Sequence, residues 1–99
     1  MTFGEMIRKG RKNLGLTLKE SADYLQGRGL NMSVGYLCDY ESDRVKGIKM
    51  DFIYEAAALY GLDSDKLCIA AGRIPKDIFY KIVAYPHLYS DIRNLQVKD

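Results

Sequence analysis

The stretch that decides the fold runs from residue 17 to residue 42 and has the sequence TLKESADYLQGRGLNMSVGYLCDYES. It opens on a capping box, in which the hydroxyl of Thr17 accepts from the backbone N–H of Glu20 while the Glu20 carboxylate reaches back. Leu18, Ala22 and Leu25 follow at helical spacing. We therefore expect a helix that begins after Thr17 and buries this apolar face.

A second helix is expected after a short break. The segment 26–31 interrupts the apolar spacing and contains two glycines, which favour a turn. Ser33 is a favoured N-cap, and a helix from there to about residue 42 buries Leu37 and Tyr40. The same residues include β-branched and aromatic types, so a strand is the alternative. Because no partner strand is evident, the helix is favoured.

Helical spacing also dominates on both sides of this stretch. Phe3, Ile7, Gly10 and Leu14 share the inner face of a first helix, which is expected to end near Gly15. Four later helices are predicted, the first two at about 51–60 and 63–72. The third begins at Pro75 and has an apolar stripe of Ile74, Ile78 and Ile82. The fourth begins at Pro86 and has an apolar stripe of Leu88, Ile92 and Leu95. The fold class is therefore predicted to be all-α.

A chain of 99 residues is long enough for one hydrophobic core and too short for two. With 47% hydrophobic and 28% charged residues, its composition is that of a globular protein and not of a disordered one. No apolar run approaches the roughly 18 residues that span a bilayer, and none follows the basic residues near the N-terminus. We expect a cytoplasmic protein that does not enter a membrane.

Residues with reactive or metal-binding side chains are few. Cys38 and Cys68 lie far apart without a CxxC motif, and His87 is the only histidine. Two buried or half-buried thiols are expected, with a disulfide as the alternative. One imidazole makes neither a metal site nor a catalytic triad, and no nucleophile–base pair or phosphate-binding glycine loop is evident. We expect no metal, no cofactor and no enzymatic activity.

Positive charge is concentrated in the first half of the chain. The net charge is only +2. Residues 1–50 carry nine Lys and Arg against six Asp and Glu, whereas residues 51–99 carry six against seven. A basic surplus in one region is a mild indication of nucleic-acid binding.

One helix followed by two short helices joined by a turn is the frame of a helix-turn-helix domain. The residues themselves resemble the phage-repressor family of the Cro and xenobiotic-response-element type at Glu41 and in the segments 4–11, 15–17, 22–25, 33–37 and 57–62. The run 70–75 resembles an extension that one branch of the family carries. The resemblance implies a lambda-repressor-like, five-helix DNA-binding domain over residues 1–74 and a helical extension over residues 75–99.

Two features depart from the family pattern. The family usually has a tight turn between its second and third helices, whereas this chain has additional residues at 26–31. Leu18 stands where part of the family has a glutamine that bonds a phosphate, so we expect that contact to be absent.

The resemblance implies a sequence-specific regulator of transcription, by family default a repressor, that binds double-stranded DNA. One short recognition helix covers too few base pairs for useful specificity, so a homodimer on a two-fold symmetric operator is expected. The apolar stripes of the last two helices are candidates for the dimer contact, and packing on their own core is the alternative. A rival function is that of an antitoxin or a mobile-element control protein whose main partner is another protein.

The family geometry places Ser33, Val34, Gly35, Tyr36 and Asp39 on the side of the recognition helix that faces the major groove. Val34 suits a thymine methyl group, Gly35 allows close approach of the backbone, and Asp39 is able to accept from a cytosine amine. The alternative is that Tyr36 belongs to the core and that Asp39 is simply solvated.

Basic residues beside the recognition helix are predicted to contact phosphates. Arg44, Lys46 and Lys49 lie on the loop that follows it, and Lys19 and Arg28 are further candidates. The alternative for all of them is a solvated charge, and for Arg28 that alternative is favoured.

Arg11 and Glu41 occupy positions that form a partly buried ion pair in family members. A bidentate pair between guanidinium and carboxylate would hold the recognition helix at one angle to the first helix. The alternative is two ordinary surface charges.

Overall fold

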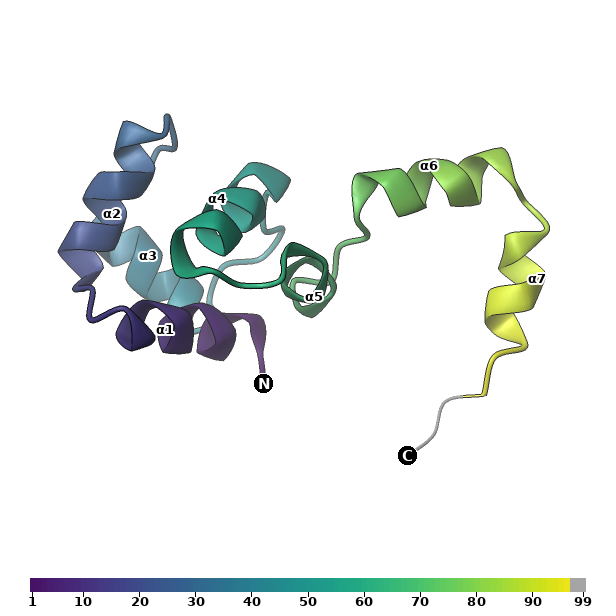
Figure 1. Cartoon of the computed structure of the whole chain (residues 1–99), viewed down its shortest axis with the longest axis horizontal. Helices are drawn as coiled ribbons and strands as arrows, with labels where there is room; N and C mark the ends of the chain where they lie inside the picture. The colour runs from purple at the N-terminus through teal and green to yellow at the C-terminus, as the bar shows by residue number, and fades with distance from the viewer. Residues whose placement is uncertain (97–99) are drawn as a thin grey trace.

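The computed structural model describes residues 1–96 and contains only α-helices in that range (Figure 1). In chain order they are α1 (Phe3–Asn13), α2 (Leu18–Gly27), α3 (Val34–Glu41), α4 (Met50–Tyr60), α5 (Ser64–Ala70), α6 (Lys76–Ala84) and α7 (Leu88–Arg93). The fold class is all-α, as predicted, and the alternative of a strand in the segment that forms α3 is wrong. Residues 97–99, the end of the predicted extension, lie outside the described residues.

Local capping interactions explain where the central helices begin. The Thr17 hydroxyl accepts from the Glu20 backbone N–H at 3.1 Å, and the Thr17 N–H donates to the Glu20 carboxylate at 3.0 Å. The hydrogen bond from the Thr17 backbone N–H lowers the pKa of the Glu20 carboxylate. Ser33 caps α3 in the predicted way, because its hydroxyl accepts from the backbone N–H of Tyr36 at 3.0 Å. A second capping box, between Thr2 and Glu5 at the start of α1, was not predicted.

Helices α1 to α5 pack around one core. α1 packs against α3, α4 and α5, while α2 packs against α3 and α4 against α5. The fully buried side chains include Ile7, Leu25, Leu37, Ile53 and Leu67, so each of the five helices contributes to the core. This shared core holds α3 between α1 and α2.

Two leucines depart from the predicted apolar faces. Leu14 is 53% exposed, because α1 ends at Asn13 and Leu14 caps it instead of continuing its inner face. Leu95 is 70% exposed and lies beyond the end of α7 at Arg93. Each helix ends before its predicted last apolar residue.

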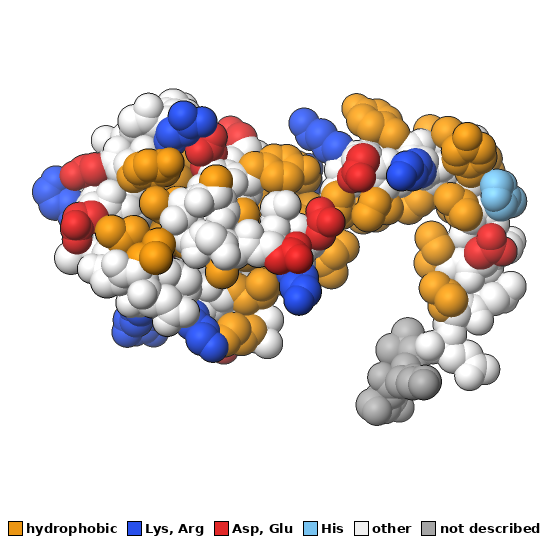
Figure 2. Space-filling model, in the orientation of Figure 1, with side chains coloured by type: hydrophobic (Ala, Val, Ile, Leu, Met, Phe, Trp, Pro, Cys, Tyr) orange, Lys and Arg blue, Asp and Glu red, His pale blue; other side chains and the backbone are white. Residues whose placement is uncertain are grey.

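Residues 74–95, which we call the arm, extend away from the five packed helices (Figure 1). Neither α6 nor α7 contains a buried residue, and Pro75 is the buried residue at the base of the arm. The two helices therefore do not pack back onto the core. Hydrophobic side chains cover much of the arm surface (Figure 2). None of the helices in residues 1–96 has the length and hydrophobicity of a membrane-spanning segment.

Candidate nucleic-acid interface

The first turn of α3 is open on its outer side. Ser33, Val34 and Gly35 are all exposed, Val34 by 43%. A Cβ atom added at Gly35 would meet nothing within 4 Å, so the helix backbone itself is accessible there. The turn thus presents a hydroxyl, a branched methyl pair and bare backbone next to one another.

Tyr36 lies at the boundary between the core and this open surface. Its ring centroid is 4.8 Å from that of Tyr40, and the Tyr40 hydroxyl donates to the Tyr36 hydroxyl at 3.3 Å. Tyr40 in turn stacks on Phe52 of α4 at 3.9 Å. Burial, together with the hydrogen bond to Tyr36, raises the pKa of Tyr40. Tyr36 is anchored to the core on one side and remains 36% exposed.

Arg11 and Glu41, predicted as an ion pair, make a bidentate contact between α1 and the end of α3. The Arg11 Nε donates to one Glu41 oxygen at 2.7 Å and Nη2 donates to the other at 3.0 Å. The Arg11 Nη1 also donates to the Leu16 carbonyl at 2.8 Å. The two side chains are only 11% and 6% exposed, and the hydrogen bond to Glu41 raises the pKa of Arg11. The pair fixes α3 relative to α1 and to the turn before α2.

A second tie between α1 and the end of α3 was not predicted. Asp43 has a left-handed backbone with φ of 58°, and its carboxylate accepts from the Gly4 N–H at 2.8 Å and from the Thr2 hydroxyl. Gly4 permits this approach, since a Cβ there would lie 2.4 Å from the Glu41 carbonyl oxygen. The partners are 39 and 41 residues apart in sequence, so no local pattern reveals the contact.

The loop after α3 presents two exposed lysines. Ile48 is buried and Val45 packs against the core, so the apolar side of the loop is anchored. The Arg73 guanidinium also holds the loop, because it donates to the Ile48 carbonyl at 3.4 Å. Lys46 and Lys49 are exposed, and neither forms an ion pair with any residue between 1 and 96. These two cations are available to an external anion.

Two other predicted phosphate contacts have partners within the chain. Arg44 donates to Asp39 at 3.4 Å, with the two side chains 70% and 46% exposed. Lys19 pairs with Asp23 one turn further along α2 at 3.0 Å, and both are largely exposed. Pairs this exposed are weak, so they do not prevent either cation from meeting a phosphate.

Arg28 is held by α4 instead of projecting freely. Its Nε and Nη2 donate to the two oxygens of Glu55 at 3.0 and 3.3 Å, which raises the pKa of Arg28. The loop that carries Arg28 is closed by a hydrogen bond from the Gln26 amide to the Met32 carbonyl, and Met32 is buried. The additional residues between α2 and α3 therefore form a tied loop, and the Arg28 guanidinium on it is bound to Glu55.

The remaining polar chemistry is sparse. Cys38 is half-buried and Cys68 is buried, and both are free thiols. Burial raises the pKa of Cys68. Among residues 1–96, no three His, Cys, Asp or Glu side chains gather as a metal site would require.

Comparisons of the chain with protein-family models, with curated proteins and with solved structures found no match in any of the three.

Proposed function

We propose that this protein is a sequence-specific, double-stranded-DNA-binding regulator of transcription with a lambda-repressor-like helix-turn-helix domain. In this proposal α2 and α3 are the two helices of the motif, α3 enters the major groove, and the protein acts as a homodimeric repressor on a two-fold symmetric operator. The observation that carries the proposal is the first turn of α3, which is open outside and rigidly held from behind. An exposed turn on a fixed helix is what base-edge recognition requires.

The residues of that turn fit direct readout. Ser33 is able to donate to or accept from a base edge, and Val34 fits against a thymine methyl group. Gly35 lets the helix approach the bases closely, at about 1 kcal/mol of helix propensity relative to alanine. Asp39 is paired with Arg44, so its charge is partly offset near phosphates.

The lysines beside α3 supply the sequence-independent part of binding. A cation that neutralises a phosphate releases a condensed counterion, so binding weakens as salt rises. Lys46 and Lys49, on the loop that follows α3, are exposed and form no ion pair with the residues that the structure describes. We assign them to the phosphates that flank the half-site.

Changing Lys46 and Lys49 to alanine, singly, is expected to weaken DNA binding without altering sequence preference. Each change removes one phosphate contact from each subunit. The slope of log K against log salt should therefore become less steep by about 2 for a dimer. Binding measured over a series of salt concentrations tests this.

Lys66→Ala serves as the matched control. Lys66 is an exposed lysine on α5, so its removal changes the net charge equally but should leave the slope unchanged. Equal slopes for all three variants would contradict a specific role for the loop.

A second candidate function is favoured by one observation, the exposed apolar arm. An antitoxin or mobile-element control protein would use such a surface to hold an unlike protein. A co-purifying partner that displaces DNA from the protein would support this function over the first.

A further inference from the structure

The arm exposes an unusual amount of apolar side chain. Its exposed large hydrophobic residues, between 42% and 70% accessible, are Ile74, Ile78, Phe79, Tyr80, Val83, Tyr85, Tyr89, Ile92 and Leu95. Their charged neighbours on α6 are only Lys76, Asp77 and Lys81. A helix that is apolar over most of its circumference is normally covered on more than one side.

The arm helices are too short to be stable without such a cover. α6 has 9 residues and α7 has 6. Isolated helices below about 12 residues are marginal in water, because nucleation is unfavourable and few hydrogen bonds follow it. Among residues 74–95 only Pro75, at the base of the arm, is buried, while Ile82 and Leu88 are half-buried. Residues 1–96 therefore do not supply the remaining support that these helices need.

The exposed apolar area of the arm approaches what one partner of a stable dimer buries. Four aromatic side chains of about 150–250 Å² and five aliphatic ones of about 60–120 Å², all at about half exposure, present roughly 450–800 Å² of surface. A standard protein–protein interface buries about 800 Å² on each partner.

The charges of the arm are mixed and nearly balanced. Lys76, Lys81 and Arg93 are positive, whereas Asp77 and Asp91 are negative. Such a surface does not repel a second copy of itself, and in a two-fold contact the cations of one arm are able to meet the carboxylates of the other. A strongly acidic or strongly basic partner would not be electrostatically complementary to the arm.

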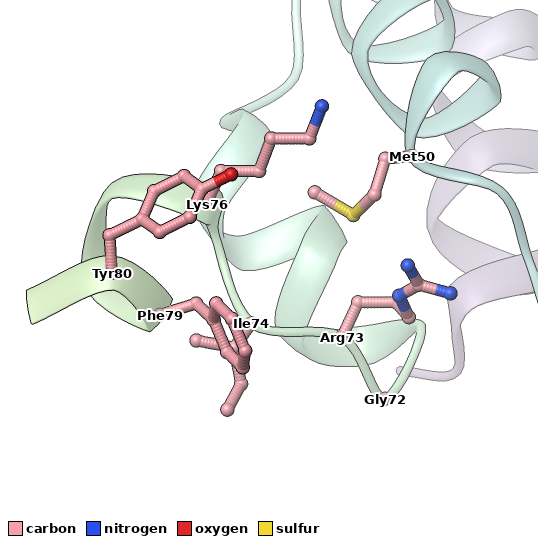
Figure 3. Close-up of a pocket in the computed structure, with 7 residues that line it drawn as sticks. All are labelled: Met50, Gly72, Arg73, Ile74, Lys76, Phe79 and Tyr80. Atoms are coloured by element: carbon pink, nitrogen blue, oxygen red, sulfur yellow. The ribbon is translucent and has the colours of Figure 1, made fainter. Parts of the chain in front are cut away.

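A hollow at the base of the arm provides a place for an inserted side chain. It has a volume of about 420 Å³ and lies between the start of α4 and the first turns of α6. Met50, Phe79 and Tyr80 are among its lining residues, with the cationic groups of Arg73 and Lys76 beside them (Figure 3). A hollow beside a projecting apolar segment is the shape that two interlocking copies need.

We propose that the arm is a self-association surface through which two copies of this chain dimerise, arm against arm about a two-fold axis. In the dimer an apolar side chain of each arm enters the hollow of the other copy. The arm and the pair α2–α3 lie at opposite ends of the molecule (Figure 1), so both copies of α3 remain exposed. The choice of a second copy rests in part on the proposed function, which needs two reading helices.

The test is the molar mass of the protein in solution, without DNA, by sedimentation equilibrium. The wild-type chain of 11.3 kDa is expected at twice that mass at micromolar concentration. Val83→Asp and Phe79→Asp place a carboxylate in the interface and are expected to weaken dimerisation by at least about 100-fold. Both residues lie outside the core of α1 to α5, so circular dichroism should show a folded protein.

Leu14→Asp is the matched control. Leu14 is 53% exposed and Val83 is 54% exposed, but Leu14 caps α1 and is not part of the arm. The control should dimerise like the wild type. A monomeric wild-type chain would overturn the proposal and leave the arm to an unlike protein, and a Val83→Asp variant that dimerises normally would also overturn it. DNA binding by single subunits is measured separately, so a failure of dimerisation is distinguishable from a failure of DNA binding.

Discussion

Replacing Glu41 with alanine is expected to lower the free energy of unfolding by about 3–5 kcal/mol, because the change leaves the Arg11 guanidinium buried without its counter-charge. Arg11 is then held only through its hydrogen bond to the Leu16 carbonyl. Since the pair joins α1 to α3, the variant should also bind DNA more weakly than its remaining folded fraction accounts for. Urea denaturation followed by circular dichroism measures the stability.

Two controls separate the buried pair from charge in general. The double variant Arg11→Met, Glu41→Leu removes both charges and is expected to lie within about 2 kcal/mol of the wild type, because no buried ion is left unpaired. Lys19→Ala breaks an exposed pair and should cost less than about 1 kcal/mol. If Glu41→Ala cost no more than Lys19→Ala, the pair would not be the tie that holds α3.

Gly4→Ala is expected to destabilise the protein by about 1–3 kcal/mol through overpacking. The added Cβ would lie 2.4 Å from the Glu41 carbonyl oxygen and 2.8 Å from that of Tyr40, and both of these atoms are backbone. Relief requires α1 to move away from the end of α3, which would also strain the contacts of Asp43 with Thr2 and Gly4. Thermal and urea unfolding both report the loss.

Gly35→Ala is the control, since Gly35 is also a glycine within a helix. A Cβ there meets nothing within 4 Å, so the gain in helix propensity should stabilise the protein by about 0.5–1 kcal/mol. The same methyl group should thus act in opposite directions at the two positions. Equal effects would mean that the close approach of α1 to α3 does not constrain Gly4. Because Gly35 faces outward, this variant should also bind DNA less tightly despite its greater stability.

The features that were predictable from the sequence are those that depend on near neighbours. The capping hydrogen bonds of Thr17 with Glu20 and of Ser33 with Tyr36 join residues three apart in sequence. A short segment of sequence is therefore enough to predict where α2 and α3 begin. Apolar spacing likewise placed Ile7, Leu25 and Leu37 in the core. The ends of the helices were harder to predict from the sequence. Leu14 continues the apolar spacing of α1, but the helix ends at Asn13 and Leu14 is its C-cap.

Contacts between distant segments were not predictable from the pattern alone. Nothing near Asp43 indicates that its carboxylate binds the start of α1, and nothing near Arg28 indicates Glu55 as its partner, 27 residues later. Arg11 and Glu41 were paired only through the resemblance to phage repressors. The apolar stripes of α6 and α7 indicated that the arm needs a cover, but amphipathic spacing does not identify which surface covers it.

The central claim, that α3 reads double-stranded DNA, is tested most directly by selecting bound sequences from a pool of random duplexes at two salt concentrations. The account predicts enrichment of two inverted copies of one half-site, with an affinity that falls steeply as salt rises.

Val34→Ala should shift the preferred base at one position of each half-site, because it removes the methyl contact to thymine. A pool that shows no enrichment and no salt-dependent binding would contradict the claim.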